Sequence, residues 1–335
     1  MIAPDARAGA MGDAGVSSSP DIYSMHWNPA KYAFIEGDMG FGISYSPWLK
    51  NIVPDLNLYS LNFYKRINDE QTFAASLLYF SLGDVNFTDN SGFPLGTYTP
   101  NEFSFDMAYA RKLSENFSAS VAARFIFSDL TQGQVVSGVE TKAGVSIAAD
   151  ISIYWRKEVQ ISRTDAVLAF GANISNIGSK ISYSDSEKEF IPTNLRFGPS
   201  LMLELDRYNT LTFMFDVNKL LVPTPDENGI QDNISVMGGI FNAFYEAPGG
   251  FSEKIKELQL SFGVEYWYDK QFAFRAGYFY ENELKGNRQF FTLGVGLKYN
   301  IFGLDLSYLI PTEQQHPLEN TLRFSLLLDF EAFGK

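Results

Sequence analysis

The stretch Leu322-Arg323-Phe324-Ser325-Leu326-Leu327-Leu328-Asp329-Phe330 shows the pattern that decides the fold. Every even-numbered position carries a large apolar residue, and three of the four odd-numbered positions carry a charge or a hydroxyl. Successive side chains of a strand point to opposite faces, so one face of this segment is apolar and the other is mainly polar. The alternation recurs about fourteen times along the chain, which predicts an all-β, 14-stranded antiparallel transmembrane β-barrel.

Composition is compatible with a membrane barrel and excludes several other classes of protein. The hydrophobic fraction of the 335 residues is 45%, yet the sequence has no run of about 18 apolar residues that could form a transmembrane helix. Aromatic residues make up 16% of the chain, a share that aromatic girdles at both membrane interfaces would explain. Cysteine is absent, which excludes disulfides and thiolate sites, and a net charge of −13 makes nucleic acid an unexpected partner.

The first 36 residues differ from the rest because they are rich in small and polar residues and show no sustained alternation. We therefore expect an N-terminal hatch segment at residues 1–36 and a transmembrane β-barrel at residues 37–333, with a long extracellular loop near residues 218–257. The chain opens at Met1 without a basic region followed by an apolar one, so we interpret it as a mature sequence whose export signal has been removed.

The lengths of the connections between predicted strands support the barrel independently. Short turns are expected near residues 66–70, 113–116, 157–164, 206–209, 269–270 and 300–301. Longer loops are expected near residues 47–56, 83–101, 128–142, 178–194, 218–257, 282–289 and 311–320. Single-chain bacterial barrels have an even number of strands, short periplasmic turns and longer outer loops. The alternation of short and long connections therefore predicts that both chain ends are periplasmic.

The polar face of the predicted strands is dominated by small residues with scattered charges of both signs, as expected for a filled barrel interior. The charged residues expected to point inward are Asp106, Arg124, Asp150, Glu204, Asp216, Glu265, Arg275, Lys298, Asp305 and Arg323. We favour an interior network of ion pairs over a role in conduction.

Signs of catalysis or metal binding are weak. The sequence holds two histidines, His26 in the N-terminal segment and His316 in the last long connection, and nothing else in the sequence supports a metal site built from both. No nucleophile elbow, Walker loop or HExxH motif is present. The glycine-rich tract Ala8–Gly15 neither follows a predicted strand nor precedes a periodic helix, so we interpret it as small residues that pack closely inside the lumen. We therefore predict no catalytic residues, no metal and no cofactor, and a protein that is not an enzyme.

Two further motifs lie outside the predicted strands. The first, Asn28-Pro29-Ala30, fixes a turn just before the barrel because proline restrains its own backbone and that of the preceding residue. The second is the 218–257 loop, whose aromatic residues argue against disorder and whose apolar cluster needs a partner or must fold onto the barrel rim. The predicted partner-binding residues are Met237, Ile240, Phe241, Phe244, Tyr245 and Phe251, supported by Leu220, Leu221 and Val222.

The Asn28-Pro29-Ala30 turn resembles the hatch of the FadL family, which has fourteen strands and an N-terminal plug. The Val222–Pro225 run, the Phe241–Phe251 segment with its Pro-Gly-Gly turn, and the final strands resemble the PorV family more narrowly. PorV proteins are FadL-like outer-membrane components of the type IX secretion system of Bacteroidetes, and the likeness extends from Ala3 to Phe333. The family's motif assigns no catalytic residues.

This resemblance implies a barrel that accepts secreted cargo proteins with a conserved C-terminal domain as they leave the SprA/Sov translocon. It then implies delivery of this cargo to the PorU sortase complex at the cell surface. One alternative is a FadL-type outer-membrane transporter for hydrophobic small molecules, which predicts an apolar lumen pocket beside the hatch. A soluble all-β binding protein is a third possibility, and partitioning into a detergent phase would separate it from the two barrels.

Overall fold

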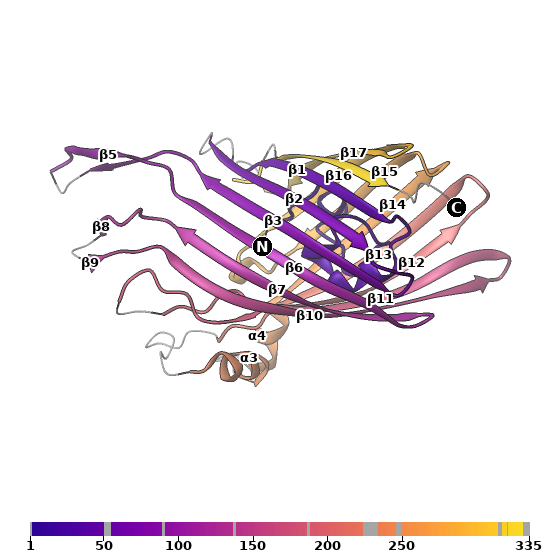
Figure 1. Cartoon of the computed structure of the whole chain (residues 1–335), viewed down its shortest axis with the longest axis horizontal. Coiled ribbons are helices and arrows are strands. Elements are labelled where there is room, and N and C mark those ends of the chain that lie inside the picture. Colours follow the sequence, from indigo (N-terminus) through magenta and orange to yellow (C-terminus); the bar gives the residue numbers. More distant parts are fainter. Residues whose placement is uncertain are drawn as a thin grey trace.

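The computed structural model describes residues 2–49, 55–88, 91–136, 139–185, 188–223, 234–245, 250–313, 317–319 and 321–330. Across these residues, fourteen antiparallel strands close into one barrel, as predicted (Figure 1). The strands are β1 (Met39–Pro47), β2 (Leu56–Arg66), β3 (Gln71–Leu82), β6 (Asn101–Ser114), β7 (Phe117–Asp129), β10 (Gly144–Ile161), β11 (Thr164–Gly178), β12 (Asn194–Glu204), β13 (Asn209–Leu220), β14 (Leu258–Tyr268), β15 (Phe272–Tyr280), β16 (Gln289–Tyr299), β17 (Phe302–Pro311) and β18 (Leu322–Phe330). Each strand pairs with the next barrel strand in the sequence, and β1 pairs with β18 to close the ring.

The alternation read from the sequence places apolar side chains on the outside of the ring. In β18, Leu322, Phe324 and Leu326 are each about 42% exposed, whereas Arg323 and Ser325 between them are buried. The same inside–outside alternation recurs around the ring, from β1 to β17. Because outward side chains of a membrane barrel meet lipid, this exposed apolar belt is the surface that a bilayer would cover.

Connections at one end of the barrel, the turn end, are short, and those at the other, the loop end, are long. The loop end carries two small hairpins that the sequence did not indicate, β4 (Val85–Thr88) with β5 (Pro94–Tyr98) and β8 (Val135–Val136) with β9 (Val139–Glu140). Figure 1 shows both projecting well past the closed ring. The predicted 157–164 turn is too long, because β10 and β11 continue to Ile161 and from Thr164. Beyond the apolar belt, a hairpin keeps its backbone hydrogen bonds even where its side chains are polar. The charged residues Arg156–Glu158 therefore do not end β10.

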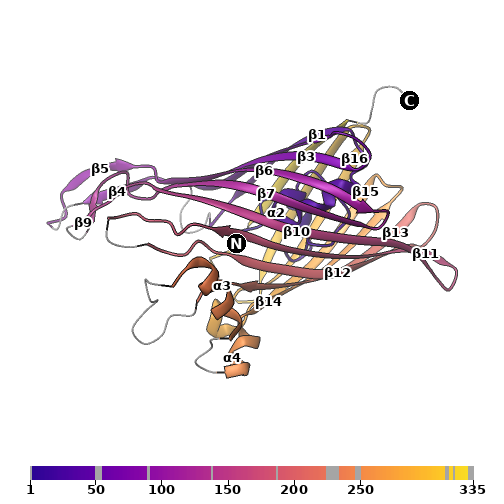
Figure 2. The ribbon, with the colours of Figure 1, turned by 60° about the horizontal axis from the view of Figure 1, so that its bottom comes forward.

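Short helical elements account for the remaining regular structure. Helices α1 (Ala6–Gly9), α2 (Ser24–Trp27) and the 3₁₀ helix η1 (Pro29–Phe34) lie inside the ring of strands (Figures 1 and 2). Helices α3 (Val236–Tyr245) and α4 (Gly250–Lys256) lie outside it in both views, in the region predicted as a long loop, and η2 (Glu283–Lys285) joins β15 to β16. Among the described residues, no helix is both long enough and apolar enough to cross a membrane.

Most of the charged residues expected to face the interior are buried there. Asp106, Asp150, Asp216, Glu265, Arg275, Asp305 and Arg323 are at most 5% exposed, and the Arg124 side chain is 12% exposed. Glu204 and Lys298 share the inward register but lie at the turn end, where they are exposed. The interior is therefore filled by side chains, and its charges need partners because a lone buried charge is strongly disfavoured.

Candidate functional site

The N-terminal segment, residues 2–35, is packed against the inner wall of the barrel. Ser19 is the only one of these residues that is exposed. The turn Asn28-Pro29-Ala30 starts η1, with the Asn28 side-chain oxygen accepting from the Ala30 N–H and Pro29 in the first turn. Asn28 Nδ2 donates to the carbonyl oxygens of Val16 and Ile153, at 2.9 Å each, so one amide joins two parts of the segment to β10.

Ala30 adds two contacts with the same part of the wall, one with β10 and one with the neighbouring β7. Its N–H donates to Ser152 Oγ at 3.1 Å, and its carbonyl oxygen accepts from Ser118 Oγ at 2.7 Å. The sequence therefore identified a turn that the structure ties to β7 and β10, although its function as a hatch stays a prediction.

A buried ion network links the same segment to the other side of the barrel. The Arg7 guanidinium donates from Nε and Nη2 to the two carboxylate oxygens of Glu265 in β14, at 2.9 and 2.7 Å. Its third nitrogen, Nη1, donates to Asp21 at 2.8 Å. Glu265 also accepts from Arg275 Nε at 2.7 Å, and Arg275 Nη1 donates to Asp305 at 2.6 Å. Bidentate, charge-assisted pairs of this kind fix geometry as well as energy.

Backbone groups of the segment are held by polar side chains of the wall. Asp216 Oδ2 in β13 accepts from the N–H groups of Gly15 and Val16, at 2.8 and 2.9 Å. The Gly12 N–H donates to Thr292 Oγ1 at 2.8 Å. At Gly12, an added Cβ would lie 2.6 Å from the Tyr278 carbonyl oxygen, and its φ of +65° already favours glycine. This close approach explains the small residues of the Ala8–Gly15 tract. From the sequence, we interpreted this tract as close packing inside the lumen rather than as a phosphate-binding loop.

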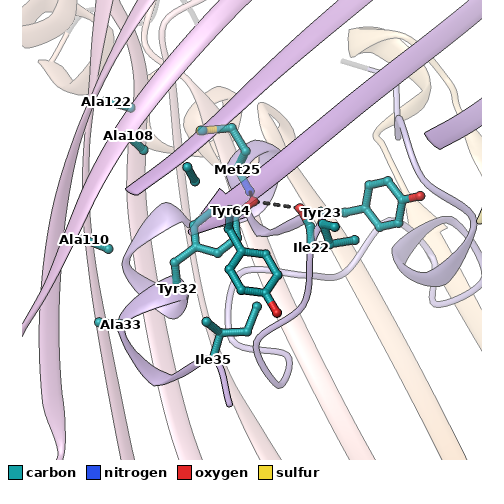
Figure 3. Packing of buried hydrophobic residues seen from close by; sticks show 11 residues of the cluster. Ile22, Tyr23, Met25, Tyr32, Ala33, Ile35, Tyr64, Ala108, Ala110 and Ala122 are labelled. Carbon is teal, nitrogen blue, oxygen red and sulfur yellow. Dashed lines mark hydrogen bonds between the residues drawn. The ribbon is translucent and has the colours of Figure 1, made fainter. Parts of the chain in front are cut away.

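Apolar residues of the segment pack on alanines that point inward from β3, β6 and β7. Figure 3 shows Met25 and Tyr32 on the side of Ala108 and Ala122, whereas Ile22 lies on the other side of the cluster, beside Tyr23. The Tyr32 hydroxyl donates to the Ile22 carbonyl oxygen at 2.7 Å and accepts from the Met25 N–H at 3.1 Å, so the cluster also satisfies its own polar groups. Small inward residues on the wall leave the space that these large side chains fill.

The Tyr23 hydroxyl lies across the seam where the barrel closes. It is 2.9 Å from the Ile43 carbonyl oxygen of β1 and 3.0 Å from the Leu326 carbonyl oxygen of β18. The segment therefore contacts the first and last strands of the ring at one point. Nothing in the spacing of Tyr23 in the sequence indicated this contact.

A second interior network stands apart from the segment. Arg124 in β7 donates to Asp106, to Asn176 and to Asp150, the last at 3.1 Å, and thereby joins β6, β7, β10 and β11. It is the interior pairing that the sequence favoured for these charges, and it braces the wall.

The two histidines do not meet at a site. His26 belongs to the buried segment, its Nε2 has no hydrogen-bond partner among the described residues, and burial lowers the pKa of this imidazole well below its usual range. His316 lies outside the described residues. No group of three or more histidine, aspartate or glutamate side chains suited to a metal ion occurs in the part of the chain that the structure describes.

Helix α3 carries five of the six predicted partner-binding residues. Met237, Phe241 and Phe244 are 53%, 57% and 40% exposed and recur at spacings of four and three residues, so they share one helix face. Tyr245 is 79% exposed, and Ile240 is less exposed, with its side chain half-buried. Phe251 is the second residue of α4, and its side chain lies outside the described set. The structure therefore gathers three of the six predicted residues on one apolar face, with Tyr245 beside it.

The opposite face of α3 is seated on the protein. Gly239 and Ala243 are buried there, and an added Cβ on Gly239 would lie 2.9 Å from the Phe190 ring and 3.0 Å from Pro223. Lys254 of α4 donates to the carbonyl oxygens of Phe244 and Tyr245, at 2.5 and 2.9 Å, and so caps the last turn of α3. Of the residues predicted to support this surface, Leu220 is exposed, Val222 is half-buried and Leu221 is buried.

Comparisons with known proteins give one family and one fold. A family model described as type IX secretion system protein PorV matches residues 1–227. A search of curated proteins gave no match. The solved toluene transporter TbuX of Ralstonia pickettii is 10% identical, with a TM-score of 0.53 and coverage of 98% of each chain.

Two further solved structures show the same likeness. A toluene transporter TodX of Pseudomonas putida is 10% identical over 96% of each chain, with a TM-score of 0.58. A FadL homologue of Pseudomonas aeruginosa is 11% identical over 99% of each chain, with a TM-score of 0.50. At such identities, these likenesses show a FadL-like barrel fold and carry no information on what this chain transports.

Proposed function

The chain belongs to the PorV family of the type IX secretion system, and on this premise we propose that it is a docking and shuttle barrel for secreted proteins. It is a FadL-like outer-membrane component of that system. In the proposal, cargo with a conserved C-terminal domain leaves a SprA/Sov-like translocon, binds this barrel and is handed to a PorU-like sortase complex. The barrel itself performs no catalysis.

One observation carries the proposal, namely the exposed apolar face of α3. The helix Val236–Tyr245 contains no charged residue, yet Met237, Phe241 and Phe244 are exposed. A contiguous apolar face of this kind marks an interaction site, and a few aromatic anchors carry most of the energy of protein interfaces. We place the loop end outside the cell, with both chain ends periplasmic, so that α3 faces the surface where cargo emerges.

The packed lumen supports the same proposal. A carrier that binds cargo on its outer loops needs a barrel that does not leak. The contacts of Arg7, Asn28 and Ala30 with the wall are suited to holding the N-terminal segment as a hatch, residues 1–36, beneath a barrel of residues 37–333. In this proposal, Asn28, Pro29 and Ala30 keep the lumen shut while α3 engages the partner.

Uptake of a hydrophobic small molecule is the alternative. Two of the solved proteins with the same fold, TbuX and TodX, are toluene transporters. In this chain, however, the described interior is crossed by charged contacts of Arg7, Glu265, Arg275 and Asp305, and such a lining is unsuited to an apolar solute.

The test is the double variant Phe241→Ala/Phe244→Ala in cells that secrete a tagged cargo protein. We expect less cargo on the purified barrel and less cargo anchored at the cell surface, with the heat-resistant fold of the barrel unchanged. Phe93→Ala/Val135→Ala is the control, because these apolar residues are 69% and 62% exposed on the other loop-end hairpins.

Normal capture and anchoring in the α3 variant would count against the proposal. Equal losses in the α3 variant and the control would mean that general loop damage, rather than the α3 face, causes the effect. If toluene or another apolar solute stayed bound to the barrel after purification in detergent, the result would instead favour uptake of a hydrophobic small molecule.

A further inference from the structure

An apolar groove crosses the outer wall of the barrel on the side formed by β14 to β18. It is a shallow, open groove with a volume of about 630 Å³, and almost all of its exposed lining is apolar. Two adjacent outward rows of paired residues form it. One row runs from Val264 through Ala276, Leu293 and Tyr308 to Leu322, and the other contains Tyr266, Phe274, Val295 and Leu306.

A small residue interrupts the first of these two rows of large residues. Ala276 points outward in β15, between Val264 and Leu293 on the neighbouring strands. The rings of Tyr266 and Phe274 stack with centroids 6.5 Å apart and border one side. The wall is therefore indented at a level where neighbouring outward side chains are aromatic or branched.

The position of the groove restricts what can cover it. It opens from the outward face of a barrel that belongs to an outer-membrane family, so the hydrocarbon of the bilayer is continuous with it. Because lipid is as apolar as this lining, the hydrophobic effect does not favour the groove over the surrounding bilayer for an apolar ligand. Van der Waals contact with the walls of the groove therefore decides whether a ligand occupies it. A flexible methylene chain can follow such an indentation, and it leaves no polar group unpaired.

Length and charge narrow the ligand further. Five strands at spacings of about 4.8 Å make a groove of roughly 19 Å, and half of the hydrocarbon core of a bilayer is about 15 Å. Towards the loop end, the groove is bordered by a neutral pair, in which the Tyr278 hydroxyl donates to Gln289 Oε1 at 3.3 Å. In the connection from β15 to β16 at the loop end, the cations Arg288 and Lys285 are paired with Glu281 and Glu253. This border suits a zwitterionic headgroup better than the phosphates of lipid A.

We propose that the groove around Ala276 is a binding site for one acyl chain of a zwitterionic membrane phospholipid. The site would hold a lipid at a fixed place on the β14–β18 wall, in contrast to the exchanging lipids around the rest of the belt. The proposal is independent of the cargo surface on α3, because it needs only the outer-membrane location of the barrel.

The test measures lipid retention by the full chain in mild detergent. Dipalmitoyl phosphatidylethanolamine is added, and native mass spectrometry counts the lipids that stay bound as collisional activation is raised. We expect the natural chain to keep one lipid after the others have been stripped. Ala276→Phe fills the groove and should lower the retained fraction roughly tenfold, the factor that corresponds to about 1.4 kcal/mol.

Ala123→Phe is the matched control, because Ala123 also points outward and is exposed, in β7 on another part of the wall. It should retain the lipid as the natural chain does, and both variants should keep the heat-resistant mobility of a folded barrel. Equal retention by the two variants, or no retained lipid in the natural chain, would overturn the proposal. Preferential retention of added lipid A, or a dimer that Ala276→Phe dissociates, would overturn it in favour of another occupant.

Discussion

Arg7 and Glu265 are separated by 258 residues in the sequence, yet their side chains form a buried bidentate ion pair with contacts of 2.7 and 2.9 Å. Arg7 belongs to the N-terminal segment and Glu265 to β14. Glu265 also accepts from Arg275, so one carboxylate compensates two guanidinium groups. The pair therefore fixes the segment to the wall, and it is the point at which loss of one charge should release it.

Glu265→Gln should loosen the N-terminal segment. The variant removes the negative charge that Arg7 and Arg275 share. Arg7 keeps its pair with Asp21 and Arg275 its pair with Asp305, so the loss should be smaller than the about 3–5 kcal/mol of a buried pair that loses its only partner. Protease cutting within residues 2–35 of the folded barrel, together with chemical unfolding in lipid vesicles, measures the effect. Asp69→Asn is the control, because Asp69 is 87% exposed where it pairs with Arg66, and surface pairs contribute about 0–1 kcal/mol. A similar response of both variants would show that the buried pair has no special importance.

Gly12→Ala should displace the segment from β15. The new Cβ would lie 2.6 Å from the Tyr278 backbone, and alanine at a φ of +65° costs a further 1–2 kcal/mol, approximately. Gly92→Ala separates the two causes, since Gly92 has a φ of +84° and no atom within 4 Å of an added Cβ. Amide hydrogen exchange of residues 8–16 should rise in Gly12→Ala and stay unchanged in Gly92→Ala. Unchanged exchange in both would contradict the close packing described here.

The Asp5 carboxyl should titrate near pH 6. Burial, reinforced by the nearby Asp21, raises the pKa of Asp5 to about 6, and the carboxylate accepts from Trp27 Nε1 at 2.6 Å. Because the folded-state pKa of Asp5 exceeds the ordinary value of about 3.9, the carboxyl group binds its proton more tightly in the folded state than in the unfolded state. Protonation of Asp5 therefore stabilises the fold. This stabilisation is complete below about pH 4 and is lost as the pH rises through 6.

Fluorescence of Trp27 in a variant with Trp48, Trp155 and Trp267 replaced by Phe would follow this titration. We expect a transition near pH 6 that Asp5→Asn abolishes. The neighbouring His26 is checked with His26→Gln, which should keep the transition. A midpoint near pH 4 would show that the surroundings of Asp5 do not raise its pKa, which would contradict the prediction.

Two adjacent glycines should respond differently in α3. Gly239→Ala places a methyl group 2.9 Å from the Phe190 ring and 3.0 Å from Pro223, so the helix must move away from its seat. In Gly238→Ala, the nearest atom is Ser235 Oγ at 3.1 Å, and helix propensity improves by about 1 kcal/mol. Amide exchange in α3 should therefore rise for Gly239→Ala and fall or stay level for Gly238→Ala. The reverse order would mean that α3 does not rest on Pro223.

The sequence predicted the outward faces of the strands well, but it did not predict the helix of the candidate partner surface or the full length of β10. The outward row Leu322, Phe324 and Leu326 could be read directly, because lipid and lumen alternate with the same period of two as the side chains. Extension of β10 past Lys157 was missed, since a hairpin outside the apolar belt tolerates charges. Helix α3 was expected only as an apolar loop, because ten residues without charge give no clear amphipathic contrast.

Sequence alone determined that this chain is a fourteen-stranded barrel, which face of each strand meets lipid, and most of the strand charges that are enclosed, because each follows from local alternation and from turn length. Only the tertiary structure decided which enclosed groups meet. Arg7 with Glu265, Asp216 with the Gly15 and Val16 amides, and Tyr23 with the β1–β18 seam are all contacts between distant parts of the chain. Their partners depend on how closure of the ring rotates and staggers each strand, and no local pattern of residues records that geometry.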